Sequence, residues 1–166
     1  MKALVVFDSK WGNTEKVALA IAAGIGKEAK AAQVGAVDSD QTNNMELLVI
    51  GSPVIGGRPS KPIQEYLKTI AQTSSTKLRI ATFDTRMTMK FAQKFGFAAV
   101  RMADQLKEQG NTLISEPMGF IVKGQKGPLA EGELDRATLW GKELMKKKWG
   151  GNLKKVEHNK SLEQSP

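Results

Sequence analysis

The chain has 166 residues, of which 40% are hydrophobic and 25% charged, an ordinary composition for a single globular domain. It contains no cysteine and one histidine, His158 in a polar C-terminal stretch, which argues against disulfides, thiolate nucleophiles, Ser-His-Asp triads and histidine-rich metal sites. The formal net charge of +8 is compatible with an acidic protein, a nucleic acid or an anionic membrane surface as partner. No apolar run approaches the roughly 20 residues of a membrane span, and Met1 leads straight into an apolar run, so we expect a cytoplasmic protein without a signal peptide.

The chain is organised around the polar stretch over residues 9–14, which follows its first apolar run and contains Ser9, Lys10, Gly12 and Thr14. Residues 2–7 predict a buried strand. Beyond the stretch, residues recur every three or four positions as on one face of a helix: Thr14, Val17, Ala18, Ile21, Ala22 and Ile25. A helix start has free backbone N–H groups and the positive end of the helix dipole, and two hydroxyls, a glycine and a lysine surround it here. The sequence therefore predicts a phosphate site at this turn.

The next elements alternate between helices and strands. We expect a helix over residues 13–31, a short strand over 33–37 and a third strand over 47–50, with Met45 at its edge. A loop rich in glycine and proline, residues 51–59, then leads to a helix over 60–72 that Ser60 is expected to cap. The inward face of that helix is predicted to carry Ile63, Tyr66, Leu67 and Ile70.

The second half of the chain continues the alternation. We expect a polar turn over 73–76, a fourth strand over 78–83, an irregular connection over 84–95, a helix over 96–109, extended pieces over 112–115 and 118–122, and a last helix over 129–148. The helix over 96–109 is predicted to bury Ala99, Met102, Ala103 and Leu106, and the last helix Leu134, Ala137, Gly141, Leu144 and Met145. Five strands alternating with helices predict an α/β protein with a parallel sheet and right-handed crossovers.

Positive charge is concentrated late in the chain, at Lys142, Lys146, Lys147, Lys148, Lys154 and Lys155. We interpret it as a solvated helix face. Aromatic residues are not interleaved with these charges as a base-stacking surface requires, so we expect no nucleic-acid partner.

Three loops leave the carboxyl ends of the predicted strands, where such sheets bind ligands: residues 9–14, 52–59 and 84–87. The first begins the segment S-K-W-G-N-T-E-K-V-A, which resembles the phosphate loop of flavodoxins. The second is part of I-G-S-P-V-I-G-G-R-P, which is similar to their second flavin loop. The later segments F-D-T-R and K-G-P-L-A-E-G-E-L resemble small flavodoxin-like proteins. The resemblance covers roughly residues 1–148. It implies a three-layer, doubly wound α/β fold with a five-stranded parallel sheet in the order 2-1-3-4-5 and FMN at the switch point. We expect a flavodoxin-like domain over 1–150 and a polar tail over 151–166.

The resemblance assigns the first loop to the FMN phosphate. Ser9 and Thr14 would donate their hydroxyls, and backbone N–H groups would complete the cradle, from Lys10, Trp11, Gly12, Asn13 and Thr14. Lys10 would add a positive charge if it points inward. The alternative is that Ser9 and Thr14 merely cap a helix.

The other two loops are assigned to the flavin ring. The second would line one face and edge of the ring, with Ser52, Pro53, Val54, Ile55, Gly56 and Gly57. The Gly56-Gly57 peptide can turn its carbonyl toward a ring nitrogen that gains a proton on reduction, because glycine tolerates either sign of φ. A plain turn is the alternative. Asp84, Thr85 and Arg86 would lie near the pyrimidine edge, where Arg86 could stabilise negative charge, unless it pairs with Asp84 or is a surface residue.

The sequence departs from many flavodoxins in three ways. The ring loops offer Val54, Ile55, Arg86, Met87 and Met89, with Phe91 further on, instead of an aromatic sandwich, so we expect weaker FMN binding. Trp11 occupies a position where a hydroxyl is common and is similar to the quinone-reductase branch of the fold; it is equally compatible with a lid or with packing. Finally, the chain is basic, whereas the family's electron carriers tend to be acidic.

These observations favour an FMN-binding electron carrier whose redox partner presents an acidic face. One alternative is an FMN-dependent NAD(P)H:quinone-type reductase. Another is a binding or regulatory domain of the same fold that has lost the flavin.

Overall fold

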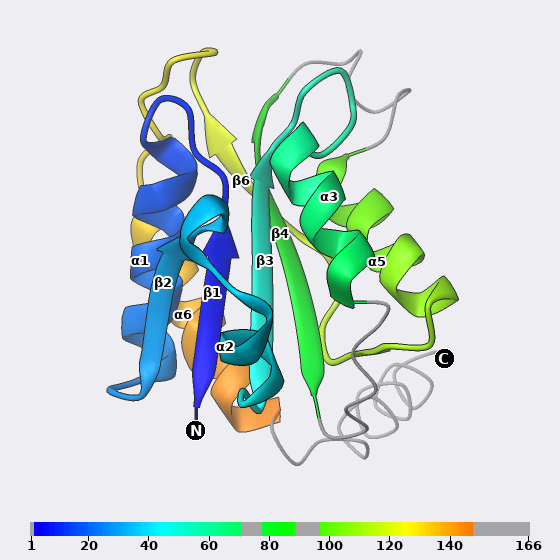
Figure 1. The fold of residues 1–166 in the computed structure, drawn as a ribbon. Coiled ribbons are helices and arrows are strands. Elements are labelled where there is room, and N and C mark those ends of the chain that lie inside the picture. Colours follow the sequence, from blue (N-terminus) through cyan, green and yellow to red (C-terminus); the bar gives the residue numbers. More distant parts are fainter. Residues whose placement is uncertain (1, 71–77, 89–96, 148–166) are drawn as a thin grey trace, which may run out of the picture.

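The computed structural model describes residues 2–70, 78–88 and 97–147, and these residues form a parallel sheet of six strands (Figure 1). The strands are β1 (Ala3–Phe7), β2 (Ala29–Gln33), β3 (Leu47–Pro53), β4 (Arg79–Met87), β5 (Thr112–Leu113) and β6 (Met118–Val122). Their order is β2-β1-β3-β4-β5, and β6 also pairs with β4. All five pairings between these strands are parallel. The predicted fold class and the order 2-1-3-4-5 are therefore confirmed.

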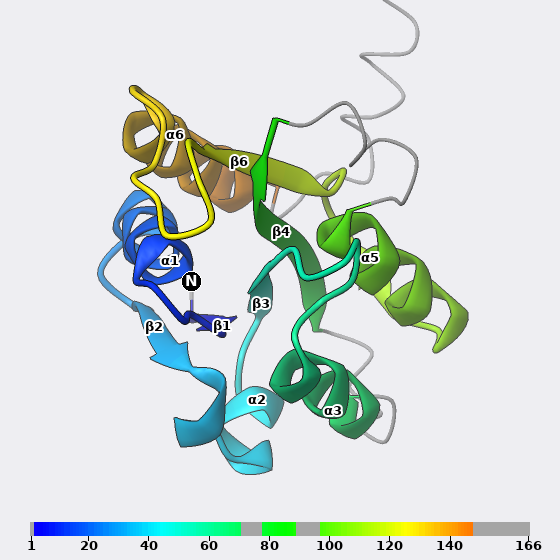
Figure 2. The same ribbon diagram turned by 90° about the horizontal axis from the view of Figure 1, so that it is seen from above.

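Helices cover both faces of this sheet (Figure 2). One face carries α1 (Asn13–Ile25) and α6 (Glu133–Lys146), and the other carries α3 (Lys61–Ile70) and α5 (Ala98–Glu108). A 3-10 turn, Val34–Ala36, and the short helix α2 (Ser39–Asn43) connect β2 to β3. Among the described helices, none combines the length and the apolarity that crossing a membrane requires.

The core lies on both sides of the sheet, which is why the central strands are apolar almost throughout. Every residue of β1 is buried. On the α1–α6 side, the rings of Phe83, Phe120 and Trp140 contact one another edge to face, with centroids 6.0–6.3 Å apart. On the other side, the apolar faces predicted for α3 and α5 are confirmed: the buried residues include Ile63, Tyr66, Leu67, Ile70, Ala99, Met102, Ala103 and Leu106.

Two glycines let the backbones of α1 and α6 touch. A Cβ atom on Gly24 would lie 2.1 Å from the Thr138 carbonyl oxygen, and one on Gly141 would lie 2.2 Å from the Ile21 carbonyl oxygen. Such distances are far inside van der Waals contact, so no larger side chain fits at this crossing. The close contact fixes α6 against α1, the helix that begins at the predicted phosphate loop.

The first half of the chain corrects three predicted boundaries. The third strand ends at Pro53 instead of residue 50, so Ser52 and Pro53 belong to the strand and not to the loop that follows it. The first helix ends at Ile25 instead of residue 31, because Gly26 leaves the helix at φ +133° while its N–H still bonds to the Ala22 carbonyl. The second strand is Ala29–Gln33, so its prediction over 33–37 was wrong, and a 3-10 turn, Val34–Ala36, follows the strand. The short helix α2 was missed, although Asp38 and Gln41 form a capping box at its start.

The second half shows larger differences. The fourth strand extends to Met87 because β6 pairs with its last five residues, so residues 84–87 are strand and not a loop. The last helix begins at Glu133 instead of residue 129. Two residues expected to face inward, Leu134 and Met145, are exposed, whereas Trp140 is buried. The expectations for 73–76, 89–95 and the tail beyond 147 lie outside the described residues.

Candidate functional site

The carboxyl ends of β1, β3 and β4 meet at one edge of the sheet, at the top of Figure 1. Backbone hydrogen bonds tie these ends together: the Asp8 N–H donates to the Gly51 carbonyl (3.2 Å) and the Val54 N–H donates to the Thr85 carbonyl (3.1 Å). The three predicted site segments thus lie at this edge. The described residues contain no group of three His, Asp or Glu side chains that could hold a metal ion.

The first segment is a turn that ends at the start of α1. Gly12 occupies the left-handed region at φ +92°, which a residue with a side chain rarely adopts. The first backbone bond of the helix runs from the Lys16 N–H to the Gly12 carbonyl (3.1 Å), so the N–H groups of residues 13–15 precede it. The Ser9 hydroxyl accepts a hydrogen bond from the Gly12 N–H (3.1 Å). Neither Ser9 nor Thr14 caps the helix, since Gly12 is the N-cap residue and makes no side-chain capping bond.

Thr14 contacts a residue that is 71 positions away in the sequence. Its hydroxyl lies 2.8 Å from the hydroxyl of Thr85, and both residues are buried. Each hydroxyl carries one proton, and their mutual hydrogen bond uses only one of the two. The pair therefore retains one O–H group that can donate to an acceptor at this edge.

The third segment contains a buried ion pair. Asp84 is fully buried and accepts two hydrogen bonds from the Arg86 guanidinium, at 2.6 and 2.9 Å, and one from the Ala99 N–H at the start of α5 (2.9 Å). The guanidinium also lies over the Phe97 ring, 3.5 Å from its centroid. Burial raises the pKa of the Asp84 carboxyl above its usual value, and the hydrogen bond from Arg86 opposes that rise. Arg86 was expected to stabilise charge on the ring, to pair with Asp84 or to be a surface residue, and in the structure it pairs with Asp84.

The second segment is a closed loop between β3 and α3. The Ser52 hydroxyl donates to the Pro53 carbonyl (2.8 Å) and accepts from the Ser60 N–H (2.9 Å), so it holds the two ends of the loop together. Its tip contains Gly56 and Gly57, both at positive φ (+57° and +77°). Ile55 is 56% exposed. Ser60 directly precedes α3, and its carbonyl accepts the first helical bond from the Gln64 N–H (2.9 Å), so its predicted N-cap position is confirmed. Its hydroxyl, however, makes no capping hydrogen bond.

A fourth segment, between β6 and α6, lies beside the first and was missed as part of the site. A Cβ atom on Gly127 would lie 2.6 Å from the Asn13 side-chain oxygen, which places this loop against the start of α1. The Lys126 ammonium is 4.9 Å from the centroid of the Trp11 indole, and the Lys10 ammonium is 5.3 Å from it. The signal that could have identified the loop is its origin at the carboxyl end of a parallel strand, the edge where ligands bind.

The family and fold follow from comparison with known proteins. A family model described as a flavodoxin domain matches residues 4–129. Among curated protein sequences, none matches this chain significantly. Among solved structures, a flavodoxin from the domain Archaea is similar at 22% identity and a TM-score of 0.76, covering 89% of this chain and 99% of its own.

Two further structures have the same fold. Oxidised flavodoxin 1 from Bacillus cereus has 18% identity and a TM-score of 0.73, covering 88% of this chain and 98% of its own. A flavodoxin, WrbA-like protein from Agrobacterium tumefaciens has 16% identity and a TM-score of 0.68, covering 89% of this chain and 96% of its own. With the family model spanning most of the sequence and the strand order to match, the chain belongs to the flavodoxin family.

Proposed function

We propose that this protein is a cytoplasmic electron carrier that binds FMN at the carboxyl edge of its sheet and exchanges electrons with protein partners. The observation that carries the proposal is the start of α1, which combines the helix N-terminus with hydroxyl groups that still have a proton to donate. Membership of the flavodoxin family supports it. The positive net charge favours a partner with an acidic face.

The residues of the first loop fit a phosphate group. The Ser9 hydroxyl accepts from Gly12 and so keeps its own proton for donation, and the Thr14–Thr85 pair keeps one proton as well. The Gly12 N–H already bonds to Ser9, so the other backbone N–H groups of residues 10–14 and the positive end of the α1 dipole would add to the attraction for a dianion. In this proposal Ser9, Thr14 and Thr85 orient the phosphate, and Gly12 permits the turn.

The ring would lie between the second and third segments. FMN supplies the redox chemistry when bound, and the protein adjusts its potential. Val54 and Ile55 would cover part of the ring by apolar contact, and the Gly56-Gly57 peptide would present its carbonyl. The Asp84–Arg86 pair is close to electrically neutral, so Arg86 would stabilise negative charge on the ring less than a lone arginine.

Anaerobic titration of the purified protein with FMN tests the proposal. We expect one FMN per chain, with quenching of the flavin fluorescence and a shifted absorbance spectrum. Affinity is expected to be lower than in flavodoxins that stack the ring between aromatic side chains. If neither signal changes, the protein is not a flavin carrier, and the reading as a binding or regulatory domain of the same fold replaces it.

An exposed aromatic residue in the phosphate loop favours a second candidate function. Trp11 is 45% exposed and offers a flat surface beside the site. The alternative is an FMN-dependent reductase of quinones or similar acceptors. Steady-state turnover of NADH or NADPH with a soluble quinone, in the absence of any added reductase, would establish the reductase function. If the FMN-loaded protein shows no turnover, the electron-carrier function remains as the proposal.

A further inference from the structure

The carboxyl edge carries a cluster of one indole and two lysines, drawn from two loops. It consists of Trp11, Lys10 and Lys126, and we refer to it as the indole–lysine cluster. The ammonium groups lie 5.3 Å (Lys10) and 4.9 Å (Lys126) from the indole centroid, within the range of cation–π contacts. Both lysines are exposed, and so is 45% of Trp11.

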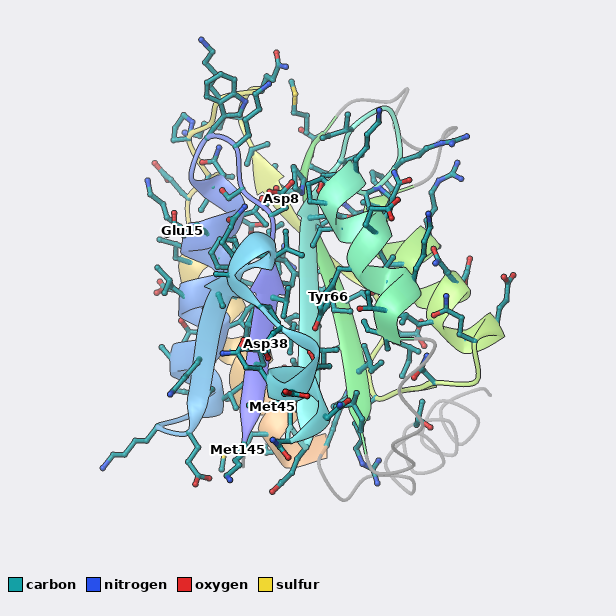
Figure 3. The ribbon with its side chains drawn as sticks, viewed as in Figure 1. Asp8, Glu15, Asp38, Met45, Tyr66 and Met145 are labelled. Carbon is teal, nitrogen blue, oxygen red and sulfur yellow. The ribbon has the colours of Figure 1, made fainter. Side chains whose placement is uncertain are left out.

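Among the described residues, the positive charges of this cluster have no ion-pair partner. Figure 3 places Glu15 on the outer flank of α1 and Asp8 close to the end of β1, both below the tip of the loop. The Asp8 carboxylate accepts a hydrogen bond from the Gln33 side chain (2.7 Å). Two like charges thus remain beside an exposed apolar surface.

We propose that the indole–lysine cluster docks a redox protein that presents a patch of carboxylates around its redox centre. An exposed tryptophan is among the residue types that contribute most to binding at protein interfaces. The lysines add charges opposite to those of the carboxylates, which orient the two proteins during their encounter. The inference rests on the proposed function, because docking at this edge would bring the partner's redox centre next to the flavin. One electron would then pass from the reduced flavin to the oxidised centre of the partner, with no bond formed or broken.

Burial separates this docking role from phosphate binding. Thr14 and Thr85, which carry the hydroxyl donors, are buried residues with 2% and 5% of their surface exposed, whereas the two lysines are exposed. Lys126 in particular belongs to the loop between β6 and α6, outside the turn that the phosphate would occupy. We therefore assign its charge to the partner.

Charge reversal at Lys126 tests the proposal. Lys27 is the matched control: it is an exposed lysine in a loop, at the opposite edge of the sheet between α1 and β2. The probe is the haem domain of an acidic b-type cytochrome, and a basic c-type cytochrome is the comparison. After reduction of the FMN-loaded protein with dithionite, stopped-flow absorbance measures the second-order rate of haem reduction at several ionic strengths.

We expect K126E to reduce the acidic cytochrome about tenfold more slowly than wild type at low salt, with the difference shrinking at high salt, and K27E to stay within about twofold. With the basic cytochrome, K126E should be as fast as wild type or faster. Equal rates for K126E and K27E would overturn the proposal. So would a loss of FMN affinity in K126E with riboflavin affinity retained, which would assign the lysine to the phosphate.

Binding measured without flavin separates this proposal from the proposed function. Isothermal titration of the purified protein with the acidic cytochrome at low salt should give a weaker complex for K126E than for K27E. Carbodiimide cross-linking, which joins ammonium groups to carboxylates, should recover Lys10 and Lys126 in the linked peptides. If the protein binds no FMN but the isothermal titration still distinguishes K126E from K27E, the carrier function fails and the docking surface stands. If the titration does not distinguish the two variants, the docking surface fails.

Discussion

Thr14 and Thr85 come from distant parts of the chain and share one hydrogen bond at the edge of the sheet. A buried hydroxyl with an unused proton is costly unless an acceptor meets it, so such a pair favours a ligand oxygen. The sequence singled out both residues, but no local pattern indicates that they touch. Their contact depends on the pairing of β3 with β4 and on the packing of α1, which are long-range features.

The double variant S9A/T14V should bind FMN at least about 100-fold more weakly than wild type, because two hydrogen bonds to a charged group are lost at roughly 1.5–3 kcal/mol each. Riboflavin, which lacks the phosphate, should lose less than about threefold. Fluorescence titration with both ligands measures the difference. The control is T138V, whose hydroxyl bonds to the Leu134 carbonyl on an exposed part of α6. An equal loss for FMN and riboflavin would contradict the phosphate assignment.

Arg86 is held inside the protein by its partner. Replacing it with methionine would leave the fully buried Asp84 carboxylate without its cation, so R86M should lower the free energy of unfolding by about 3 kcal/mol or more. The double variant D84N/R86M should recover part of this loss, since no buried charge remains. Urea denaturation followed by circular dichroism measures both. If R86M unfolds at the same urea concentration as wild type, the ion pair contributes nothing to stability.

At the scale of elements, the start of α6 is fixed to β6 by one glutamate and one arginine. The Glu133 carboxylate accepts hydrogen bonds from the Ile121 N–H (2.6 Å) and from the Arg136 guanidinium (2.7 and 2.9 Å). Arg136 also donates to the Gly119 carbonyl and lies over the Phe120 ring. The hydrogen bonds from Arg136 are the largest cause of the lowered pKa of Glu133, and the bond from Ile121 adds to them against an opposing effect of burial.

The pH dependence of this connection has a definite sign. Because the pKa of Glu133 is lower in the folded protein than its usual 4.5, the carboxylate stabilises the fold above that pH and loses the effect as the pH falls further. We expect E133Q to cost about 1 kcal/mol at pH 7, since the Arg136 side chain is 42% exposed and water weakens the pair. The difference from wild type should shrink below pH 4.5 in thermal melts. A difference that grows as the pH falls would contradict the assignment.

Element types were easier to predict than element ends. Every residue that the apolar spacing assigned to the inward faces of α3 and α5 is buried, because a helix that packs against a sheet has only one apolar face. The end of β4 was missed, since residues 84–87 become a strand only through pairing with β6 and with the end of β3. For the same reason, the sequence could not decide between the roles of Arg86, or place Lys126 against Trp11: both depend on which strand ends become neighbours.

At the scale of the whole molecule, the net charge of +8 sets the field around the proposed flavin. Extra negative charge on the reduced flavin is stabilised by a positive field, which raises the reduction potential relative to that of an acidic relative. The Asp84–Arg86 pair contributes little to this field because its charges nearly cancel. Exposed lysines such as Lys10 and Lys126 contribute more, and their effect reaches the flavin mainly through solvent.

The salt dependence of the reduction potential therefore separates the contribution of exposed lysines from that of the buried Asp84–Arg86 pair. Solvent-exposed charges are screened over about 10 Å at 0.1 M salt, whereas a buried pair is hardly affected. If the surface field favours the reduced form by about 0.5–1 kcal/mol, raising the salt from about 0.02 to 0.5 M should lower the two-electron potential by roughly 10–20 mV, since 30 mV corresponds to about 1.4 kcal/mol. Anaerobic redox titration with a reference dye measures the shift, and an acidic flavodoxin, in which the field has the opposite sign, should shift upward. A potential that rises with salt in this protein would mean that its surface charge does not favour the reduced flavin.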